Sequence, residues 1–160
     1  MKDFRIYVDT SVLGGCFDAE FSTWSIGLIE DFRQGVFRPV LSDITAVEVA
    51  RAPEQVRTLH EEMVGIGEVV SVTGDVLKIV AAYEANGILG PRYRNDLLHI
   101  ALATVASVDA VVSWNFRHIV RLEKIQLFNQ TNAELGYRSL AIHSPREVTS
   151  YDSDNPHSSR

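Results

Sequence analysis

The chain has 160 residues, of which 46% are hydrophobic and 22% charged, so it is long enough for one globular domain with a sizeable core. Its net charge of −6 argues against broad electrostatic binding to nucleic acid or an anionic membrane, although a locally basic site is compatible with it. The single Cys16 excludes an intramolecular disulfide and a cysteine-based zinc site. No apolar run reaches membrane-spanning length, and residues 1–20 carry no signal-peptide pattern, so we expect a cytoplasmic protein.

Strand-like and helix-like segments alternate along the chain. Strands are expected at residues 6–8, 37–41, 68–72, 110–113 and 139–142. Helices are expected at residues 23–34, 43–51, 53–65, 75–86, 95–107 and 117–125. This alternation predicts an α/β fold with a parallel sheet covered by helices on both faces. Because no repeat or linker divides the chain, residues 1–149 are expected to form a single domain, followed by a disordered polar tail at residues 150–160.

Local signals mark several of these boundaries. Ser22 and Ser42 precede expected helices as N-caps, and Gly35 and Gly87 follow expected helices as stop signals. Pro39 lies in the second expected strand, which indicates a sheet edge or the start of a strand. Each signal agrees with the alternating order of strands and helices.

The first expected strand breaks off at an aspartate, in the sequence Tyr7-Val8-Asp9-Thr10-Ser11. One interpretation is a turn residue, because Asp hydrogen-bonds nearby backbone and favours turns. The other is a functional carboxylate at the carboxyl end of a parallel strand, where α/β folds build their sites. Asp9 alone leaves both interpretations open.

Two further acids have a distinctive context. Glu48 lies among apolar neighbours in an expected helix, and its ordinary interpretation is a solvated position paired with Arg51. Asp96 opens another expected helix, where the helix dipole favours a first-turn acid. Taken singly, each of these structural roles explains the residue at least as well as a functional role does.

Taken together, the acids favour a cation site. Asp9 ends a strand and Asp96 begins a helix, so both belong to the rim of the sheet where α/β sites form. If Glu48 joins them, three carboxylates repel one another unless a cation lies between them. Oxygen ligands of this kind suit Mg²⁺ or Mn²⁺.

Four segments, in order along the chain, resemble the successive signatures of PIN-domain nucleases. They are VDTSVL around Asp9, TAVEVA around Glu48, NDLLHIALA around Asp96 and VVSWNFRHI around Asn115. Among these nucleases the chain is most similar to bacterial ribonuclease toxins of the VapC type, over residues 5–148. The resemblance implies an α/β/α sandwich with a mostly parallel sheet and Mg²⁺- or Mn²⁺-dependent cleavage of RNA. It also implies a homodimer and a cognate antitoxin.

The resemblance further implies a role for each site residue. Asp9 and Asp96 are expected to be the principal metal ligands, and Glu48 is expected to orient the attacking water or to act as its general base. Asn115 stands where many PIN nucleases have an acid, so the site is expected to carry less charge and to bind a second ion less tightly. Asn115 can also cap the following helix, and the two roles are compatible.

Several residues near the acids are candidates for substrate contacts. The basic side chains closest to them in sequence are Arg92, Arg94, Arg117 and His118. These suit phosphate oxygens, with solvated charge or pairing with nearby acids as the ordinary alternative. Thr10 or Ser11 either hydrogen-bonds a ligand carboxylate or phosphate, or simply forms the turn. Trp114 either stacks on bases or lies in the core, and the core is favoured because it ends a buried strand. His99, three residues after Asp96, either faces the site or is a satisfied helix histidine, and the second interpretation is favoured.

Two other functions compete with the nuclease. Phosphatases of the haloacid-dehalogenase type also have an Asp after the first strand, but they need a second Asp two positions on, where this chain has Ser11. The stronger rival is a degenerate PIN-like module that binds RNA or a protein without cleaving, which Asn115 and the acidic net charge favour. Divalent-dependent activity that vanishes with a chelator separates an enzyme from such a module.

Overall fold

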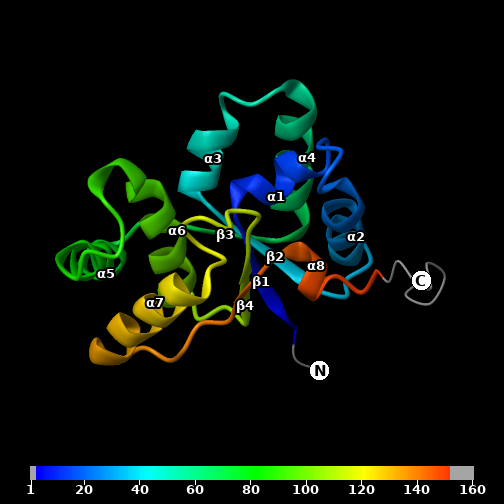
Figure 1. The fold of residues 1–160 in the computed structure, drawn as a ribbon. Helices are drawn as coiled ribbons and strands as arrows, with labels where there is room; N and C mark the ends of the chain where they lie inside the picture. Colours follow the sequence, from blue (N-terminus) through cyan, green and yellow to red (C-terminus); the bar gives the residue numbers. More distant parts are fainter. Residues whose placement is uncertain (1–2, 152–160) are drawn as a thin grey trace.

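The centre of the molecule is a sheet of five strands (Figure 1), seen in a computed structural model that describes residues 3–151. The strands are β1 (Arg5–Val8), β2 (Arg38–Ser42), β3 (Glu68–Val70), β4 (Ala110–Val112) and β5 (Ile142–His143). Their pairings are all parallel, and the order across the sheet is β3-β2-β1-β4-β5. The central strand is therefore β1, with β2 and β4 on either side.

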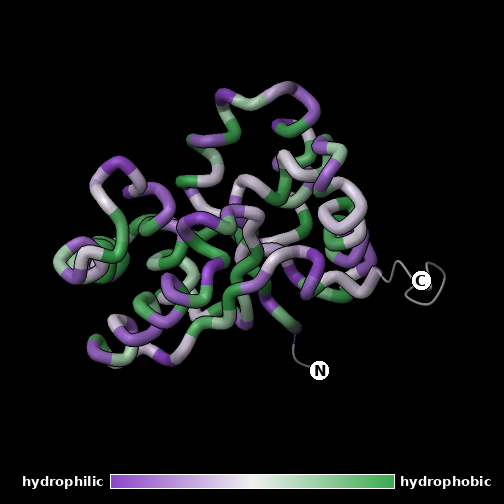
Figure 2. Tube along the Cα trace, in the orientation of Figure 1, coloured by the Kyte–Doolittle hydropathy of each residue, from purple (hydrophilic) through white to green (hydrophobic). Residues whose placement is uncertain are grey.

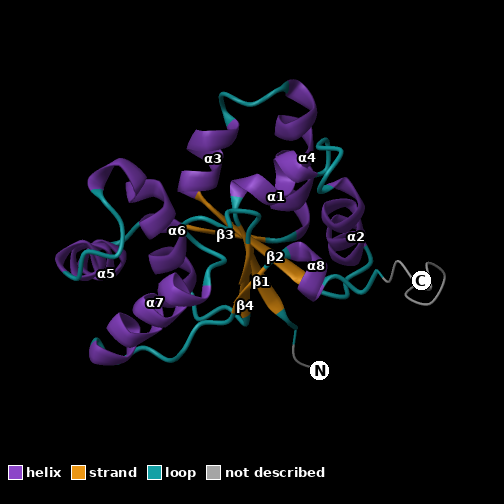
Figure 3. Ribbon diagram, in the orientation of Figure 1, coloured by secondary structure: helices purple, strands orange, loops and turns teal. Residues whose placement is uncertain are grey.

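Helices fill the connections and surround the strands (Figure 3). They are α1 (Thr10–Gly15), α2 (Ser22–Arg33), α3 (Asp43–Val49), α4 (Glu54–Ile66), α5 (Gly74–Ala85), the 3-10 helix η1 (Pro91–Tyr93), α6 (Arg94–Val105), α7 (Leu122–Glu134) and α8 (Pro145–Val148). Helices α5, α6 and α7 supply one cluster of buried side chains, and α1, α2 and α4 supply another. The architecture is thus the predicted α/β/α sandwich.

The central strand contributes to both clusters. Tyr7 packs in the cluster of α5, α6 and α7, whereas Ile6 and Val8 pack in the cluster of α1, α2 and α4, because successive strand side chains point to opposite faces. A parallel strand buried on both faces needs an apolar run of this kind. Outer helices such as α4 and α7, by contrast, carry both hydrophobic and hydrophilic residues (Figure 2), as expected of a layer with one face in water. Helix α6 is the exception, because residues 97–104 are all buried.

Most predicted boundaries agree with the structure to within a few residues. Of the two predicted N-caps, one is correct and one is wrong. Ser42 is a true N-cap, since its side chain accepts a hydrogen bond from the Thr45 N–H at 3.3 Å. Ser22 is not a cap, because it is the first residue of α2 and Phe21 holds the N-cap position. Pro39 is the second residue of β2, an interior strand, so it marks a strand start and not a sheet edge.

Two predicted segments differ more. The helix expected at residues 117–125 is wrong at its start, because residues 116–119 form turns and Arg121 has an extended backbone. Helix α7 begins only after Arg121 and continues to Glu134. The segment after Asp9 is a short helix, α1, and not a simple turn.

The expected tail falls mostly outside the described residues, which end at Tyr151. Within them, the Ser150 N–H donates to Asp31 Oδ2 at 2.8 Å, and the Tyr151 ring lies edge-on to Trp24 at 5.7 Å between centroids. The end of the described chain is therefore attached to α2.

The parallel sheet determines where a site can form. All strands end along one edge, and the segments that follow them meet there. Asp9 directly follows β1, Asn115 follows β4 by three residues, and Glu48 lies on α3, which directly follows β2. Among residues 3–151, no helix is both long and apolar enough to cross a membrane.

Candidate active site

Asp9 is held rigidly at the end of the central strand. Its backbone N–H donates to the Val112 carbonyl at 3.1 Å, and the residue is only 6% exposed. The hydroxyls of Ser11 and Ser113 both donate to Asp9 Oδ2 at 2.7 Å. The other oxygen, Oδ1, lies 3.4 Å from His99 Nε2. Because the side chain makes no capping hydrogen bond to α1, the turn-residue interpretation does not explain it.

Glu48 reaches the same place from helix α3. Its Oε1 accepts a hydrogen bond from the Thr10 hydroxyl at 2.7 Å and lies 2.7 Å from His99 Nε2. Its Oε2 has a longer contact, 3.5 Å from Asn95 Nδ2. Glu48 is therefore a half-buried group facing the end of β1, which the solvated interpretation did not predict.

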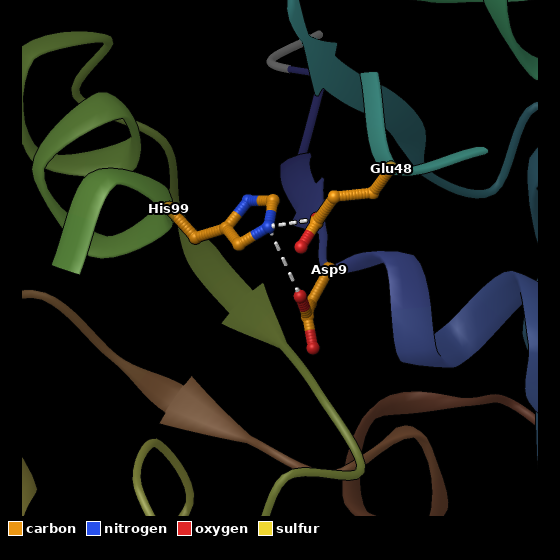
Figure 4. A group of neighbouring side chains, drawn as sticks. All are labelled: Asp9, Glu48 and His99. Atoms are coloured by element: carbon orange, nitrogen blue, oxygen red, sulfur yellow. Dashed lines mark hydrogen bonds and ion pairs between the residues drawn. The ribbon is translucent and has the colours of Figure 1, made fainter. Parts of the chain in front are cut away.

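His99 lies between the two acids, and Figure 4 shows its ring extending from α6 toward both carboxylates. It is 1% exposed, and its second nitrogen, Nδ1, lies 2.6 Å from the Tyr7 hydroxyl. The prediction that His99 is a satisfied histidine is correct. Its ring also faces the acidic cluster, as the other interpretation of this residue allowed.

Asp96 forms the outer part of the cluster with Asn115 and His118. It lies in the first turn of α6, as predicted. Its Oδ2 accepts from Asn115 Nδ2 at 3.4 Å and lies 3.1 Å from His118 Nδ1. Asn115 Oδ1 accepts the His118 backbone N–H at 2.9 Å. Asn115 therefore caps a turn, where a helix was expected, and contacts Asp96 at the same time.

The pKa of Asp96 shows that the acids influence one another. Burial and the nearby charge of Asp9 raise the pKa of Asp96, although His118 and His99 act in the opposite direction. The charge of Asp9 thus disfavours the ionised form of Asp96, and a bound cation would relieve this repulsion.

Glu48 and His99 form a complementary pair. Burial alone would raise the pKa of Glu48, but hydrogen bonding to His99 and the charge of its ring, with help from Thr10, lower it overall. Burial alone would lower the pKa of His99, but Tyr7, Glu48 and Asp9 together raise it well above its ordinary value. The histidine therefore stabilises the ionised carboxylates next to it.

The donor set fits a divalent cation. One ligand atom from each of Asp9, Glu48 and His99 lies within 4.8 Å of the other two. Carboxylate oxygens suit Mg²⁺ and Mn²⁺, whereas an imidazole nitrogen suits softer transition metals. Asp96 is a further carboxylate, and the charge of Asp9 contributes to its raised pKa.

Of the four basic candidates, His118 is the one placed against an acid of the cluster. Its ring also packs on Tyr93, with 4.0 Å between centroids. Arg94 instead donates to Glu84 on α5 at 2.8 Å, as the alternative of pairing with a nearby acid predicted. Arg94 is thus directed away from the acids.

The other two arginines are exposed. Arg92 lies over the Tyr93 ring at 5.9 Å from its centroid, and Arg117 lies in the turn after β4. Trp114 is in the core as expected, 8% exposed, with its ring stacked on Phe21 and its Nε1 donating to a buried serine hydroxyl at 2.7 Å. The exposed arginines therefore remain candidates for phosphate contacts. Trp114 is a core residue.

Sequence reasoning missed two members of the cluster, Tyr7 and Ser113, and placed His99 at the site only as the less favoured interpretation. One available signal was a polar group inside an apolar segment, because a buried imidazole or phenol needs hydrogen-bond partners. A second signal was strand register: Val8 pairs with Val112, so the next residues, Asp9 and Ser113, are neighbours. That register is a tertiary fact, which a single segment of sequence does not contain.

No protein-family model matches the sequence, and no curated protein matches it significantly. Solved structures do match. A chain of VapBC2 from Rickettsia felis, crystallised with a DNA fragment from the promoter, matches with TM-score 0.56 and 13% identity, over 88% of this chain and 98% of that chain.

Two further structures agree. A chain of FitAcB from Neisseria gonorrhoeae matches with TM-score 0.57 and 16% identity, over 89% of this chain and 99% of that chain. A chain of FitAB bound to an IR36 DNA fragment matches with TM-score 0.54 and 17% identity, over 88% and 95%. At such identities the similarity concerns the fold. The molecule has the PIN-like fold that the resemblance to VapC-type proteins implied.

Proposed function

We propose that the chain is a divalent-metal-dependent ribonuclease that hydrolyses RNA phosphodiester bonds in the cytoplasm, and that it is the toxin of a toxin–antitoxin pair. The observation that carries the proposal is the approach of Asp9, Glu48 and His99, with one ligand atom of each within 4.8 Å of the others, where the strands of a PIN-like fold end. Asp96, whose pKa the charge of Asp9 raises, is proposed as the third carboxylate. Acids gathered in this way have a clear use if a cation binds among them and a phosphodiester binds to the cation.

Asp9 and Asp96 would hold Mg²⁺ or Mn²⁺. Asp9 is the better fixed of the two, since Ser11 and Ser113 secure Oδ2 and leave Oδ1 turned toward the cluster. When bound, the cation lowers the pKa of an attacking water and neutralises charge on the phosphate. The chain's own contribution is to hold the carboxylates in place before substrate arrives.

Glu48 would orient the attacking water and accept its proton. Its Oε1 is engaged by Thr10 and His99, whereas Oε2 has the long 3.5 Å contact with Asn95. Oε2 is therefore the oxygen with room for a water molecule. The lowered pKa of Glu48 keeps it ionised at neutral pH, as a general base requires.

Asn115 and His118 would position Asp96 and complete the rim. The neutral amide of Asn115 adds no charge, so we expect the first cation to bind more tightly than a second. His118 and the exposed Arg92 and Arg117 would contact phosphate oxygens of the RNA.

A cognate antitoxin and a homodimer belong to the same proposal. The structures named above are VapBC2, FitAcB and FitAB, two of them bound to DNA fragments. Their shared fold supports a search for a protein partner of this chain. A partner that covers the acidic cluster would inhibit cleavage, which is what an antitoxin must do.

One observation favours the alternative, a PIN-like module that binds without cleaving. His99 contacts Glu48 at 2.7 Å and Asp9 at 3.4 Å, so these two acids are held together without a cation. Asn115 removes a further charge from the cluster. A chain that has lost catalysis could retain this arrangement as a purely structural network.

Cleavage of labelled RNA with Mn²⁺, and then with a chelator, separates the two functions. The wild type should cleave only with the cation. Asp9→Asn keeps the shape of the side chain but removes a ligand charge, so cleavage should fall roughly a thousandfold or more, since a catalytic cation contributes several kcal/mol. Asp75→Asn, at an exposed position in the first turn of α5, is the matched control and should cleave normally.

Two results would contradict the proposal. Cleavage by Asp9→Asn at the wild-type rate would place the activity elsewhere or attribute it to a contaminant. Absence of cleavage by the wild type across varied RNA substrates, with specific RNA or protein binding retained, would favour the non-cleaving module.

A further inference from the structure

On the basis of the proposed function, we further propose that Tyr7 and His99 are positioning residues, which hold Glu48 in its working orientation. In this assignment His99 is a hydrogen-bond donor to Glu48 and not a ligand of the metal, although its ring lies among the acids. The inference rests on a continuous hydrogen-bonded line through the core that ends at Glu48.

The line runs across three elements of the fold. Ser42 ends β2, Tyr7 lies in β1 and His99 lies in α6, and their exposed fractions are 0%, 0% and 1%. The Tyr7 hydroxyl is 2.7 Å from Ser42 Oγ and 2.6 Å from His99 Nδ1. His99 Nε2 is 2.7 Å from Glu48 Oε1. The carboxylate at the rim is thereby connected to the most buried part of the sheet.

The donors and acceptors along this line have a consistent order. The Thr45 N–H donates to Ser42 Oγ, so Ser42 is free to donate its own hydrogen to Tyr7. Tyr7 then donates to His99 Nδ1, which leaves Nε2 to carry the ring proton and to donate to Glu48. With the opposite order the ring is an imidazolium, and Nε2 still carries a proton.

Whether His99 donates a hydrogen bond or binds the metal depends on the proton on its Nε2. An ionised carboxylate only accepts hydrogen bonds, so a nitrogen 2.7 Å from Glu48 Oε1 must be the donor of that bond. A protonated nitrogen has no lone pair for a cation. The ring therefore cannot bind metal while the bond to Glu48 stands, which leaves the cation to the carboxylates.

Glu48 needs such support because of where it lies. It is a long side chain near the end of the seven-residue helix α3, and its carboxylate is partly exposed. Thr10 and His99 together fix one oxygen, Oε1, so the other oxygen has a defined direction. Apolar side chains would fill this part of the core without polar atoms to satisfy. A buried phenol and imidazole cost free energy unless their polar atoms are hydrogen-bonded, so packing alone does not account for Tyr7 and His99.

Nitrogen-15 NMR of the histidine rings, first with a chelator and then with saturating Mg²⁺, tests the assignment directly. We expect the His99 ring signals to show a proton on Nε2 that exchanges slowly with water, and to keep that proton when Mg²⁺ stabilises the protein. Loss of the proton and a metal-bound nitrogen signal on adding Mg²⁺ would overturn the assignment and make His99 a ligand.

Kinetics test the positioning role. In His99→Ala, kcat should fall roughly tenfold to a hundredfold, the range for removing a group that orients a functional residue, with KM within about twofold of wild type. In His99→Gln the amide donor should restore part of the loss. In Tyr7→Phe, which removes one hydroxyl, the loss should be smaller, roughly threefold to tenfold. All three should keep most of the unfolding-midpoint shift that Mn²⁺ produces.

Tyr83→Phe is the matched control. Tyr83 is also fully buried, and its hydroxyl donates to Asn132 at 2.5 Å on the side of the core formed by α5 and α7. It should lose stability without losing kcat. If Tyr7→Phe and His99→Ala behave in the same way, their role is structural and the inference is wrong. Absence of cleavage by the wild type would refute the proposed function alone, because the ring-proton measurement would still support or overturn the assignment of His99 as a donor.

Discussion

The candidate site has two halves that are built differently. The inner half consists of Asp9, Glu48 and His99. Its two carboxylates accept hydrogen bonds of 2.7 Å from hydroxyl groups, and Glu48 lies 2.7 Å from the buried ring of His99. The outer half, Asp96, Asn115 and His118, has contacts to Asp96 of 3.1 and 3.4 Å. The inner half is fixed by the core, and the outer half is held by the turn after β4.

The difference indicates a division of labour. An inner half fixed in advance costs little reorganisation when a cation and substrate bind. In the outer half, burial and the charge of Asp9 raise the pKa of Asp96, so this carboxylate is the one that a cation relieves most. The outer half also contains Asn115, where the chain departs from the commoner PIN pattern. We therefore expect stability without metal to depend mainly on the inner half, and the gain in stability that a bound cation gives to depend mainly on the outer half.

The largest effect on stability should come from the inner half. Ser113→Ala removes a buried hydroxyl that donates to Asp9 and accepts the Asn115 N–H at 2.9 Å. The free energy of unfolding should fall by about 1–3 kcal/mol, because buried polar groups lose a partner. Urea denaturation with a chelator measures it, with Ser71→Ala at an exposed position as control. A loss no greater than the control's would mean that the inner half is not tightly held.

Asn115→Asp should change the stability of the outer half in opposite directions without and with metal. The new charge faces Asp96, so without metal the free energy of unfolding should fall by on the order of 1 kcal/mol. With Mn²⁺ the same charge attracts the cation, and the metal-induced rise in the unfolding midpoint should exceed that of the wild type. An equal rise in both proteins would show that Asn115 lies outside the metal's reach and acts as a cap alone.

Asp96→Asn should give a smaller, pH-dependent effect. Since the folded-state pKa of Asp96 is raised above 3.8, its ionised form destabilises the metal-free fold at pH values above that pKa. The variant should therefore be more stable than the wild type at neutral pH with a chelator. The advantage should shrink as pH falls through the raised pKa and disappear below 3.8. A constant difference across this range would contradict the raised pKa.

His118→Gln should have the smallest effect. The His118 ring is 3.1 Å from Asp96, while its backbone N–H, which the substitution retains, makes the bond to Asn115. Partly exposed pairs of this kind contribute up to about 1 kcal/mol, so thermal unfolding should show a smaller loss than in Ser113→Ala. An equal or larger loss would mean that the two halves are equally rigid.

The sequence was sufficient to predict the parallel sheet and the positions of Asp9 and Asp96 in the elements of the fold, because both have local signals. Strands and helices alternate, and Asp9 and Asp96 stand where a strand ends and a helix begins. The start of α7 had no such signal, since the extended Arg121 that delays it is neither Gly nor Pro. The role of Tyr7 could not be predicted, because it shows only through hydrogen-bond partners that lie 35 and 92 residues away in sequence.

Anomalous diffraction from a crystal soaked in Mn²⁺ tests whether a divalent cation binds among these acids. The predicted result is a manganese peak between Asp9 and Asp96, within ligand distance of a carboxylate oxygen of each and with the His99 ring still turned to Glu48. A peak on another face of the sheet, or no peak at a Mn²⁺ concentration that supports RNA cleavage, would contradict it.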